Sequence, residues 1–261
     1  MALVALFVFA SCKKNTGVTN QPYEAYGTPA NKGQLKVNLA FAYAIDYANL
    51  RIKLNGAYVS NLLQSRTPFP GGGFNTRGSN FALYMSVPLG SNAVSIVMPK
   101  FGTNVDSVVL FSTNVNITDN TPQTLHLTDT AANMKSVLVR NNINNIADGM
   151  CRFNFVHLMP NVPAVDLYLN GVLMRANIPY LGASGAMDIP VGINAPGFVS
   201  GATTIWAVRA AGATSTSAAL VSFASASGLI SGGALTGFCM GYSGATGARL
   251  PFLAMTLDKN Q

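Results

Sequence analysis

The sequence predicts an all-β protein with two tandem immunoglobulin-like antiparallel β-sandwich domains, which follow a lipoprotein signal and a short tether. Two observations carry this prediction. A unit of two strands ending in Asn-Gly occurs in residues 39–56 and again, in altered form, in residues 155–171. Elsewhere, short apolar runs alternate with Gly, Asn or Pro, and no stretch keeps a helical period. We therefore expect few helices.

The composition argues against a protein with membrane-spanning helices and against a nucleic-acid-binding protein. Only 10% of the 261 residues are charged, against about 25% in a typical soluble domain. The apolar residues are scattered, and no run reaches the roughly 18 residues that a membrane-spanning helix needs. The net charge is +7, but no basic run interleaves with aromatic residues. We therefore expect no nucleic-acid partner.

The N-terminus predicts a signal for export and membrane anchoring. Residues 1–11 form a short apolar segment that ends in small residues before Cys12, which resembles a bacterial lipoprotein signal. We expect acylation of Cys12, and residues 12–33 then form a polar, flexible tether. Lys13 after the cysteine suggests, by analogy with lipoprotein sorting, the outer membrane; the leaflet stays undecided. A plain signal peptide is the alternative.

The internal repeat defines the domains. With Asn55-Gly56 aligned on Asn170-Gly171, the apolar positions of both preceding strands coincide, and so do their polar neighbours. A shift of one residue would exchange the two faces. We predict a first sandwich at 34–140, a linker at 141–149 and a second sandwich at 150–261. Each half is long enough to fold alone, and the polar faces are expected to point to solvent.

The second copy also carries a family resemblance. Its "CRFNFVHLMPNVPAVDLYLNG", followed by "MDIPVG" and "IWAVRAAG", resembles the bacterial domain of unknown function 4397. The resemblance is close over residues 150–261, whereas residues 34–140 look like a divergent copy with Phe41 in place of His157. It implies an immunoglobulin-like sandwich in secreted or surface proteins, common among Bacteroidetes lipoproteins. It implies no activity.

Residues suited to catalysis are few. The chain has one Glu and two His, and it lacks the nucleophile-elbow, phosphate-loop and zinc-protease motifs. His157 with Asp166 suggests an acid–base pair, but a histidine before a proline-rich bend more often bonds backbone carbonyls, which we favour. His126 is expected to point outward from its strand. The sequence predicts no metal site and no cofactor.

Two further features are candidate modification sites. Cys151 and Cys239 are a candidate disulfide, which an oxidising compartment permits; the alternative is that both are small core residues. Ser107 and Thr130 each follow an Asp and precede an aliphatic or small residue, which resembles the Bacteroidetes O-glycosylation pattern.

The segment 67–81, "TPFPGGGFNTRGSNF", is the candidate ligand-binding loop. Phe69 and Phe74 offer flat apolar faces, and Arg77 adds a planar charged fork. Loops on a rigid scaffold often carry binding residues. The competing interpretation is that these rings pack against the other domain.

Together these features predict a non-enzymatic envelope lipoprotein that acts as a binding or structural, adhesin-like module. Its expected partners are the membrane, through the lipid anchor, and a glycan or surface protein. The alternative is a surface accessory or enzyme that acts on polysaccharide, which would need paired carboxylates in a cleft. The sequence does not indicate an oligomeric state.

Overall fold

The structure is a computed structural model that describes residues 31–41, 50–100, 102–103, 105–130, 132–224 and 229–260. Strands make up 52% of the chain and helices 3%, so the all-β fold class is confirmed. The only helices in these ranges are the short 3-10 turns η2 (Gly192–Asn194) and η3 (Gly247–Arg249). Cys12 and the whole signal segment lie outside the described residues.

The first half of the chain forms two facing sheets. Its outer sheet has the order β3-β2-β7-β8, and its inner sheet has the order β10-β9-β1-β4 with β6 also paired to β1. These strands are β1 (Lys32–Leu39), β2 (Arg51–Leu54), β3 (Ala57–Tyr58), β4 (Pro68–Phe69), β6 (Met85–Pro88), β7 (Gly90–Pro99), β8 (Asp106–Ile117), β9 (Pro122–Thr128) and β10 (Lys135–Arg140).

The second half repeats this arrangement. Its inner sheet has the order β14-β11-β17-β18-β5, and its outer sheet has the order β13-β12-β15-β16. The strands are β5 (Gly73–Phe74), β11 (Met150–Leu158), β12 (Ala164–Leu169), β13 (Val172–Pro179), β14 (Met187–Pro190), β15 (Ile205–Ala210), β16 (Val221–Ala224), β17 (Ala234–Met240) and β18 (Phe252–Lys259). Only β5 comes from the first half.

The strand pairings of the two halves correspond, except that β1–β4 in the first half and β5–β18 in the second have no counterpart. The outer-sheet pairs β2–β3, β2–β7 and β7–β8 match β12–β13, β12–β15 and β15–β16, all antiparallel. In the inner sheets, β1 pairs parallel with β9, as β11 does with β17. The purely antiparallel pairing expected from the sequence is therefore wrong at one place in each half, because a long-range crossover joins the first strand to the penultimate one.

The Asn-Gly turns have the same geometry in both copies. Asn55 and Gly56 have φ of 50° and 85°, and Asn170 and Gly171 have φ of 49° and 81°. Two successive positive φ values form the mirror-image turn that matches the twist of a hairpin, which Asn-Gly adopts readily. Each Asn also accepts a hydrogen bond from the strand that pairs with the other side of its hairpin, Asn55 from the Ala93 amide of β7 (2.9 Å) and Asn170 from the Ile205 amide of β15 (2.8 Å).

Each half has its own apolar core between its two sheets. The aligned positions that the repeat predicted as inward are all buried except Leu54, which is half-buried. The first core contains Leu35, Val37, Leu39, Leu50 and Ile52; the second contains Cys151, Phe153, Phe155, Val165, Leu167 and Leu169. The alternation in the sequence thus assigned the core faces correctly.

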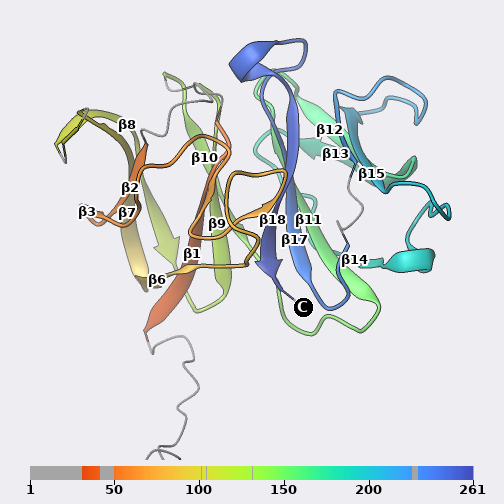
Figure 1. Ribbon diagram of the computed structural model, residues 1–261, viewed down its shortest axis with the longest axis horizontal. Coiled ribbons are helices and arrows are strands. Elements are labelled where there is room, and N and C mark those ends of the chain that lie inside the picture. Colours follow the sequence, from red (N-terminus) through yellow and green to blue (C-terminus); the bar gives the residue numbers. More distant parts are fainter. Residues whose placement is uncertain are drawn as a thin grey trace, which may run out of the picture.

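The opposite faces of the two inner sheets are not in solvent. Figure 1 shows four successive layers, in which the two inner sheets lie side by side at the centre of the molecule. A third apolar cluster joins them: Ala40, Val139, Val156, Leu158, Phe238, Met240 and Ala254. Polar residues of the same faces, such as Lys36 and Asn38, are buried here as well. The expectation of solvated polar faces is therefore wrong, because each inner sheet is covered by the other.

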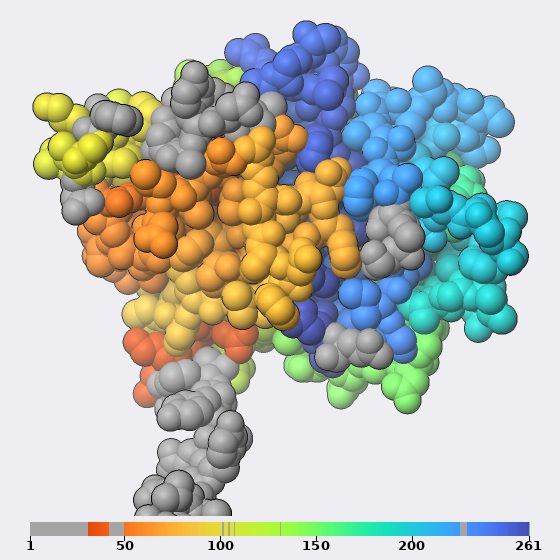
Figure 2. All heavy atoms as spheres, viewed as in Figure 1, coloured from red at the N-terminus to blue at the C-terminus, as the bar shows by residue number. Residues whose placement is uncertain are grey.

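The segment 67–81 connects the two sandwiches. Its β4 pairs with β1 of the first inner sheet, and its β5 pairs with β18 of the second, with Gly73 opposite Thr256 and Phe74 opposite Met255. In Figure 2 this segment, in light orange, lies across the boundary between the two halves. The first half therefore supplies an edge strand to the second, and this shared strand predicts that the two halves stabilise each other.

Candidate functional site

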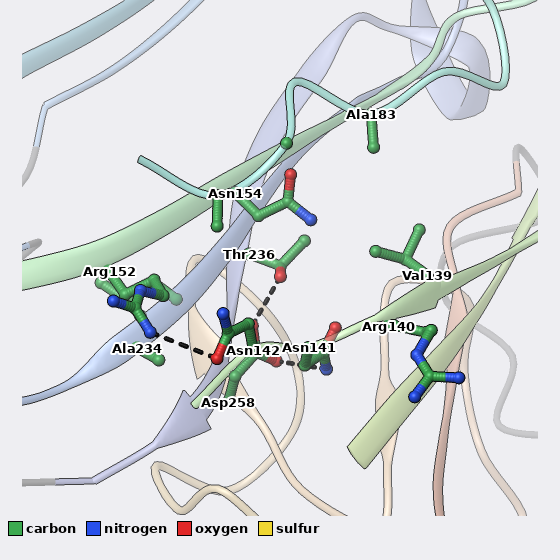
Figure 3. Close-up of a pocket in the computed structure, with 13 residues that line it drawn as sticks. Val139, Arg140, Asn141, Asn142, Arg152, Asn154, Ala183, Ala234, Thr236 and Asp258 are labelled. Atoms are coloured by element: carbon green, nitrogen blue, oxygen red, sulfur yellow. Dashed lines mark hydrogen bonds between the residues drawn. The ribbon is translucent and has the colours of Figure 1, made fainter. Parts of the chain in front are cut away.

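The most unusual chemistry lies between the two inner sheets, around the carboxylate of Asp258 on β18. This side chain is only 4% exposed. It accepts hydrogen bonds from Thr236 Oγ1 (2.5 Å), Asn141 Nδ2 (3.0 Å) and the Tyr84 hydroxyl (3.2 Å). Figure 3 shows Asp258 between Thr236 and Asn141. We call Lys36, Tyr84, Asn141, Thr236 and Asp258 the interface polar cluster.

Lys36 reaches into this cluster from β1. Its side chain is fully buried, with Nζ 3.6 Å from Asp258 Oδ1 and 4.5 Å from the centre of the Tyr84 ring. The ammonium also donates a hydrogen bond to the carbonyl oxygen of Leu257. The cluster therefore joins charged groups of both sandwiches, in a layer that the two inner sheets shield from solvent.

Burial works against both charges. It lowers the pKa of Lys36, although Asp258 opposes this, and it raises the pKa of Asp258, against the opposing effects of Lys36 and of the Thr236 and Tyr84 hydrogen bonds. Moving an ion pair out of water costs several kcal/mol per ion, which mutual attraction offsets only with good additional hydrogen bonds. Burial therefore disfavours the charged forms of both Lys36 and Asp258.

A small pocket of about 180 Å³ opens beside the cluster. Asn141, Asn154, Thr236 and Asp258 line it, with small residues such as Ala183. Asn141 Oδ1 is buried without a hydrogen-bond partner in the structure. A buried acceptor without a hydrogen bond usually lowers the stability of the fold by about 1–3 kcal/mol. The hydrogen bonding of the cluster is therefore incomplete at the Asn141 side chain.

The rim of the pocket holds two arginines with different roles. Arg152 binds Asp188 through Nε (2.7 Å) and Nη2 (2.8 Å), and its Nη1 donates to Asn142 Oδ1 (3.2 Å). This fork fixes the segment after β10 against β11. Arg140 is directed away from the other labelled side chains (Figure 3) and binds Asp119 instead (2.6 Å).

Both histidines are buried. His157 Nε2 lies 2.8 Å from the carbonyl oxygen of Val162, and its Nδ1 accepts from the Met159 amide (3.3 Å), which confirms the expected backbone role. Asp166 accepts from the amides of Asn177 (2.7 Å) and Gly212 (2.9 Å). The carboxylate thus stabilises an irregular part of β12, and the suggested acid–base pair is not formed.

His126 differs from the expected outward, exposed residue. It points away from the first core but is fully buried at the interface, beside the ring of Phe238 at a centroid distance of 5.9 Å. Its Nδ1 lies 2.9 Å from Asn38 Nδ2, so Nδ1 is the acceptor and the neutral ring carries its proton on Nε2. Burial, assisted by the charge of Lys36, lowers the pKa of His126 to about 3.

This histidine predicts an acid-sensitive fold. Because its folded pKa lies below the ordinary value of 6.5, its contribution is complete above pH 6.5 and is lost as pH falls toward 3, by at most roughly 1.4 kcal/mol per pH unit. We expect the free energy of unfolding, measured with urea between pH 7 and 4.5, to fall with pH. His126→Gln should flatten the slope in part, since burial also lowers the pKa of His157. An unchanged slope would contradict this assignment.

The candidate disulfide is absent: both Cys151 and Cys239 are free and buried. They lie on the paired strands β11 and β17, but Cys239 is opposite His157, six positions beyond Cys151. At about 3.3 Å per residue, the separation is near 20 Å, far beyond the reach of a disulfide. Burial raises the pKa of Cys151 to about 11 and of Cys239 to about 12, so both thiols stay protonated.

The residues of the candidate ligand-binding loop do not form one exposed cluster. Phe69 packs against the first core and Phe74 against the second, both half-buried. Arg77 is exposed and donates a hydrogen bond to Gln64 Oε1. The two rings therefore pack against the cores, as the competing interpretation expected, and they do not form an exposed aromatic surface. Ligand binding by the loop stays a prediction.

The glycines of this loop explain its path. A Cβ on Gly72 would lie 1.7 Å from the Ser79 carbonyl oxygen, and one on Gly73 would lie 1.8 Å from that of Met255. No side chain fits at either position, so the glycine run allows close backbone contact within the loop at Gly72 and across the boundary at Gly73.

The candidate glycosylation residues lie in different settings. Ser107 is part of β8, next to Asp106, which binds Lys53 Nζ (2.7 Å) and the Tyr58 hydroxyl. Thr130 follows the β9 strand, and its amide donates to Asp129 Oδ1 (2.7 Å). Neither setting tests modification, which stays a prediction.

A second pocket, of about 420 Å³, lies in the loop after β14 and is lined mainly by small residues with Phe198 and Leu229. Within the described ranges there is no group of three His, Cys, Asp or Glu residues that could hold a metal ion. No helix among these residues is long and apolar enough to cross a membrane.

The fold and the cluster define an all-β protein of two sandwiches packed face to face around a buried polar contact. A domain of unknown function, DUF4397, is found at residues 75–168. This match begins at residue 75, within the segment 67–81, and ends inside β12, so it overlaps the predicted 150–261 only at residues 150–168. No curated protein matches the chain.

Proposed function

We propose that the chain is a non-enzymatic envelope lipoprotein whose two sandwiches act as one stiff structural or binding module. The observation that supports this is the burial of both inner sheets against each other, completed by the strand β5 that the first half lends to the second. Inter-domain contacts within a chain are usually small and allow relative motion. A buried polar and apolar layer with a shared strand opposes that motion.

Five of the seven aspartates that the structure describes favour this role over polysaccharide hydrolysis. Asp106, Asp119 and Asp188 each pair with a cation. Asp166 binds backbone amides, and Asp258 is enclosed in the interface polar cluster. A glycosidase needs two carboxyl groups that face one substrate. The surface accessory on polysaccharide remains the second candidate, since the pocket beside Asn154 offers amides to a small polar ligand.

The proposal includes the anchor and the repeat. Acyl chains on Cys12 would hold the module at the outer membrane, and residues 13–33 would lead to β1, which begins at the lower edge of the molecule in Figure 1. The matching strand pairings support the interpretation that the two sandwiches are tandem copies of one domain, the first of them divergent.

Replacing Cys12 tests the anchor. We expect Cys12→Ser to move the protein from the membrane fraction of its host to the soluble fraction and to abolish labelling with a fatty-acid analogue, because stable attachment needs two or more acyl chains. Lys14→Ser, two residues away in the tether, is the matched control and should stay in the membrane. Retention of the Cys12→Ser protein in the membrane fraction would rule out the anchor.

A further inference from the structure

The interface polar cluster combines a buried amine, a buried carboxamide and a buried carboxyl group. Lys36, Asn141 and Asp258 are 0%, 3% and 4% exposed. Asp258 Oδ1 contacts both partners, at 3.6 Å from Lys36 Nζ and 3.0 Å from Asn141 Nδ2. The three groups that an amide-forming reaction needs therefore meet at one oxygen atom.

Two further side chains hold the amine and the amide together. Tyr84 contacts the Lys36 ammonium with its ring and Asn141 Nδ2 with its hydroxyl (2.9 Å). Thr124 lies opposite Lys36 in the β1–β9 register, and its hydroxyl is 2.8 Å from Asn141 Nδ2. The backbone of Asn141 is fixed as well, because its amide donates to the Pro122 carbonyl oxygen (2.7 Å). Neither side chain of the pair is free to move far from the other.

The hydrogen bonds around Asn141 favour one orientation for reaction. In the structure, its nitrogen has three hydrogen-bond partners, which are the hydroxyls of Tyr84 and Thr124 and the carboxyl group of Asp258, and its oxygen has no hydrogen-bond partner. Rotation of the carboxamide by 180° directs its oxygen to the hydroxyls of Tyr84 and Thr124 and to a protonated Asp258. Three donors at the carbonyl oxygen are what an acyl-transfer site uses to stabilise the developing oxyanion. The NH₂ group then takes the place of the unpartnered oxygen, on a residue that lines the 180 Å³ pocket.

We propose that Lys36 and Asn141 form an intramolecular isopeptide bond, with Asp258 transferring the proton. The lone pair of the neutral Lys36 amine attacks Asn141 Cγ, and the carboxyl group of Asp258 protonates the amide oxygen. Asp258 then accepts a proton from the attacking nitrogen and passes it to the departing NH₂, and it takes back the proton of the amide oxygen as the carbonyl group re-forms. The Cγ–Nδ2 bond breaks, a Cγ–Nζ amide forms, and ammonia leaves. Asp258 ends in its starting state, so the step needs no oxidant, reductant or other reactant.

The electrostatics of the layer suit this step. Burial lowers the pKa of Lys36 and raises the pKa of Asp258, which favours the neutral amine and the protonated acid over the ion pair. An amine freed of its proton by desolvation is an activated nucleophile. The product would link β1 covalently to the segment after β10, two strands away in the same sheet.

The bond changes the tryptic peptides of the chain in a defined way. Trypsin should fail to cleave after Lys36, and residues 33–51 should be joined to residues 141–152, in which Asn141 is the first residue. The mass of this branched peptide should be about 17 Da below the sum of its parts, through the loss of ammonia in acyl transfer to an amine. Fragmentation of the full chain's digest identifies both linked residues.

Variants assign the roles. Asp258→Asn keeps the size of the side chain but cannot exchange the proton, so it should yield separate peptides; Asn141→Ala should do the same. Thr128→Val, at a buried position of the same interface whose hydroxyl binds the Leu158 carbonyl oxygen, should still be linked. Separate peptides from the folded, unsubstituted chain would overturn the proposal. Linkage of Lys36 to residues 250–259, which contain Asp258, would also overturn it, because the carboxyl group would then be the reactant.

Discussion

Phe153→Ala should lower the free energy of unfolding of the whole chain by about 3–5 kcal/mol, the usual range for removing a buried phenylalanine. Phe153 is 1% exposed, and its ring is stacked on Trp206 with centroids 4.1 Å apart. The ring also occupies the space above Gly237, where a Cβ would lie 2.6 Å from Phe153 Cζ. Truncation therefore leaves a cavity at the centre of the second core.

Urea unfolding followed by the fluorescence of Trp206, the single tryptophan, measures this loss. Leu173→Ala is the matched control: this residue on β13 is 48% exposed, so its truncation should change the stability by less than about 0.5 kcal/mol. A Phe153→Ala variant as stable as the control would mean that the second core is not packed as described.

Gly73→Val should produce the second-largest effect, a destabilisation of roughly 1–3 kcal/mol or more from overpacking. The added Cβ would lie 1.8 Å from the carbonyl oxygen of Met255, which belongs to the backbone of the other sandwich. The β5–β18 pairing cannot tolerate this contact. Phe74 should then leave the second core, against which it packs.

Hydrogen exchange at the Leu257 amide reports this change directly, because that amide donates to the Gly72 carbonyl oxygen (3.0 Å). Exchange at Leu257 should accelerate in Gly73→Val and stay slow in Asn80→Val, a substitution at an exposed position of the same loop. Equal protection in both variants would contradict the shared strand.

Local patterns were sufficient to predict much of the fold. The alternation around Leu35 and Phe153 identified the core faces, because a strand with period two must bury one set of side chains. The Asn-Gly turns were also predictable from the sequence, since few other residue pairs accept two positive φ values. The parallel pairing of β1 with β9 was not predictable in this way, because strand patterning does not say which distant strand lies alongside.

The interface polar cluster was missed for a related reason. Lys36 looks like Lys53, and both alternate with apolar residues; yet Lys53 pairs with Asp106 at a partly exposed site, whereas Lys36 is fully buried. A polar strand face suits solvent and a second polar sheet equally well. Asp258, directly after the apolar run that ends at Leu257, was the signal that could have pointed to a buried charge.

The amino-acid composition of the loop 67–81 did not decide between two structures. Three consecutive glycines indicate either a flexible segment or a close approach of two backbones. The position of the Met255 carbonyl oxygen, which the long-range β5–β18 pairing fixes, decides for the close approach. Phe69 packs against the first core and Phe74 against the second, so the predicted binding surface is instead a contact between the two sandwiches.

The central claim is that the two sandwiches unfold as one unit, and scanning calorimetry of the unsubstituted chain beside Phe153→Ala tests it most directly. We expect a single transition in both proteins, with equal calorimetric and van't Hoff enthalpies, and a midpoint lowered by roughly 6–20 °C in the variant. Phe153 lies only in the second core, so the first sandwich should follow it through the shared layer. Two transitions, of which Phe153→Ala moves only one, would contradict the claim.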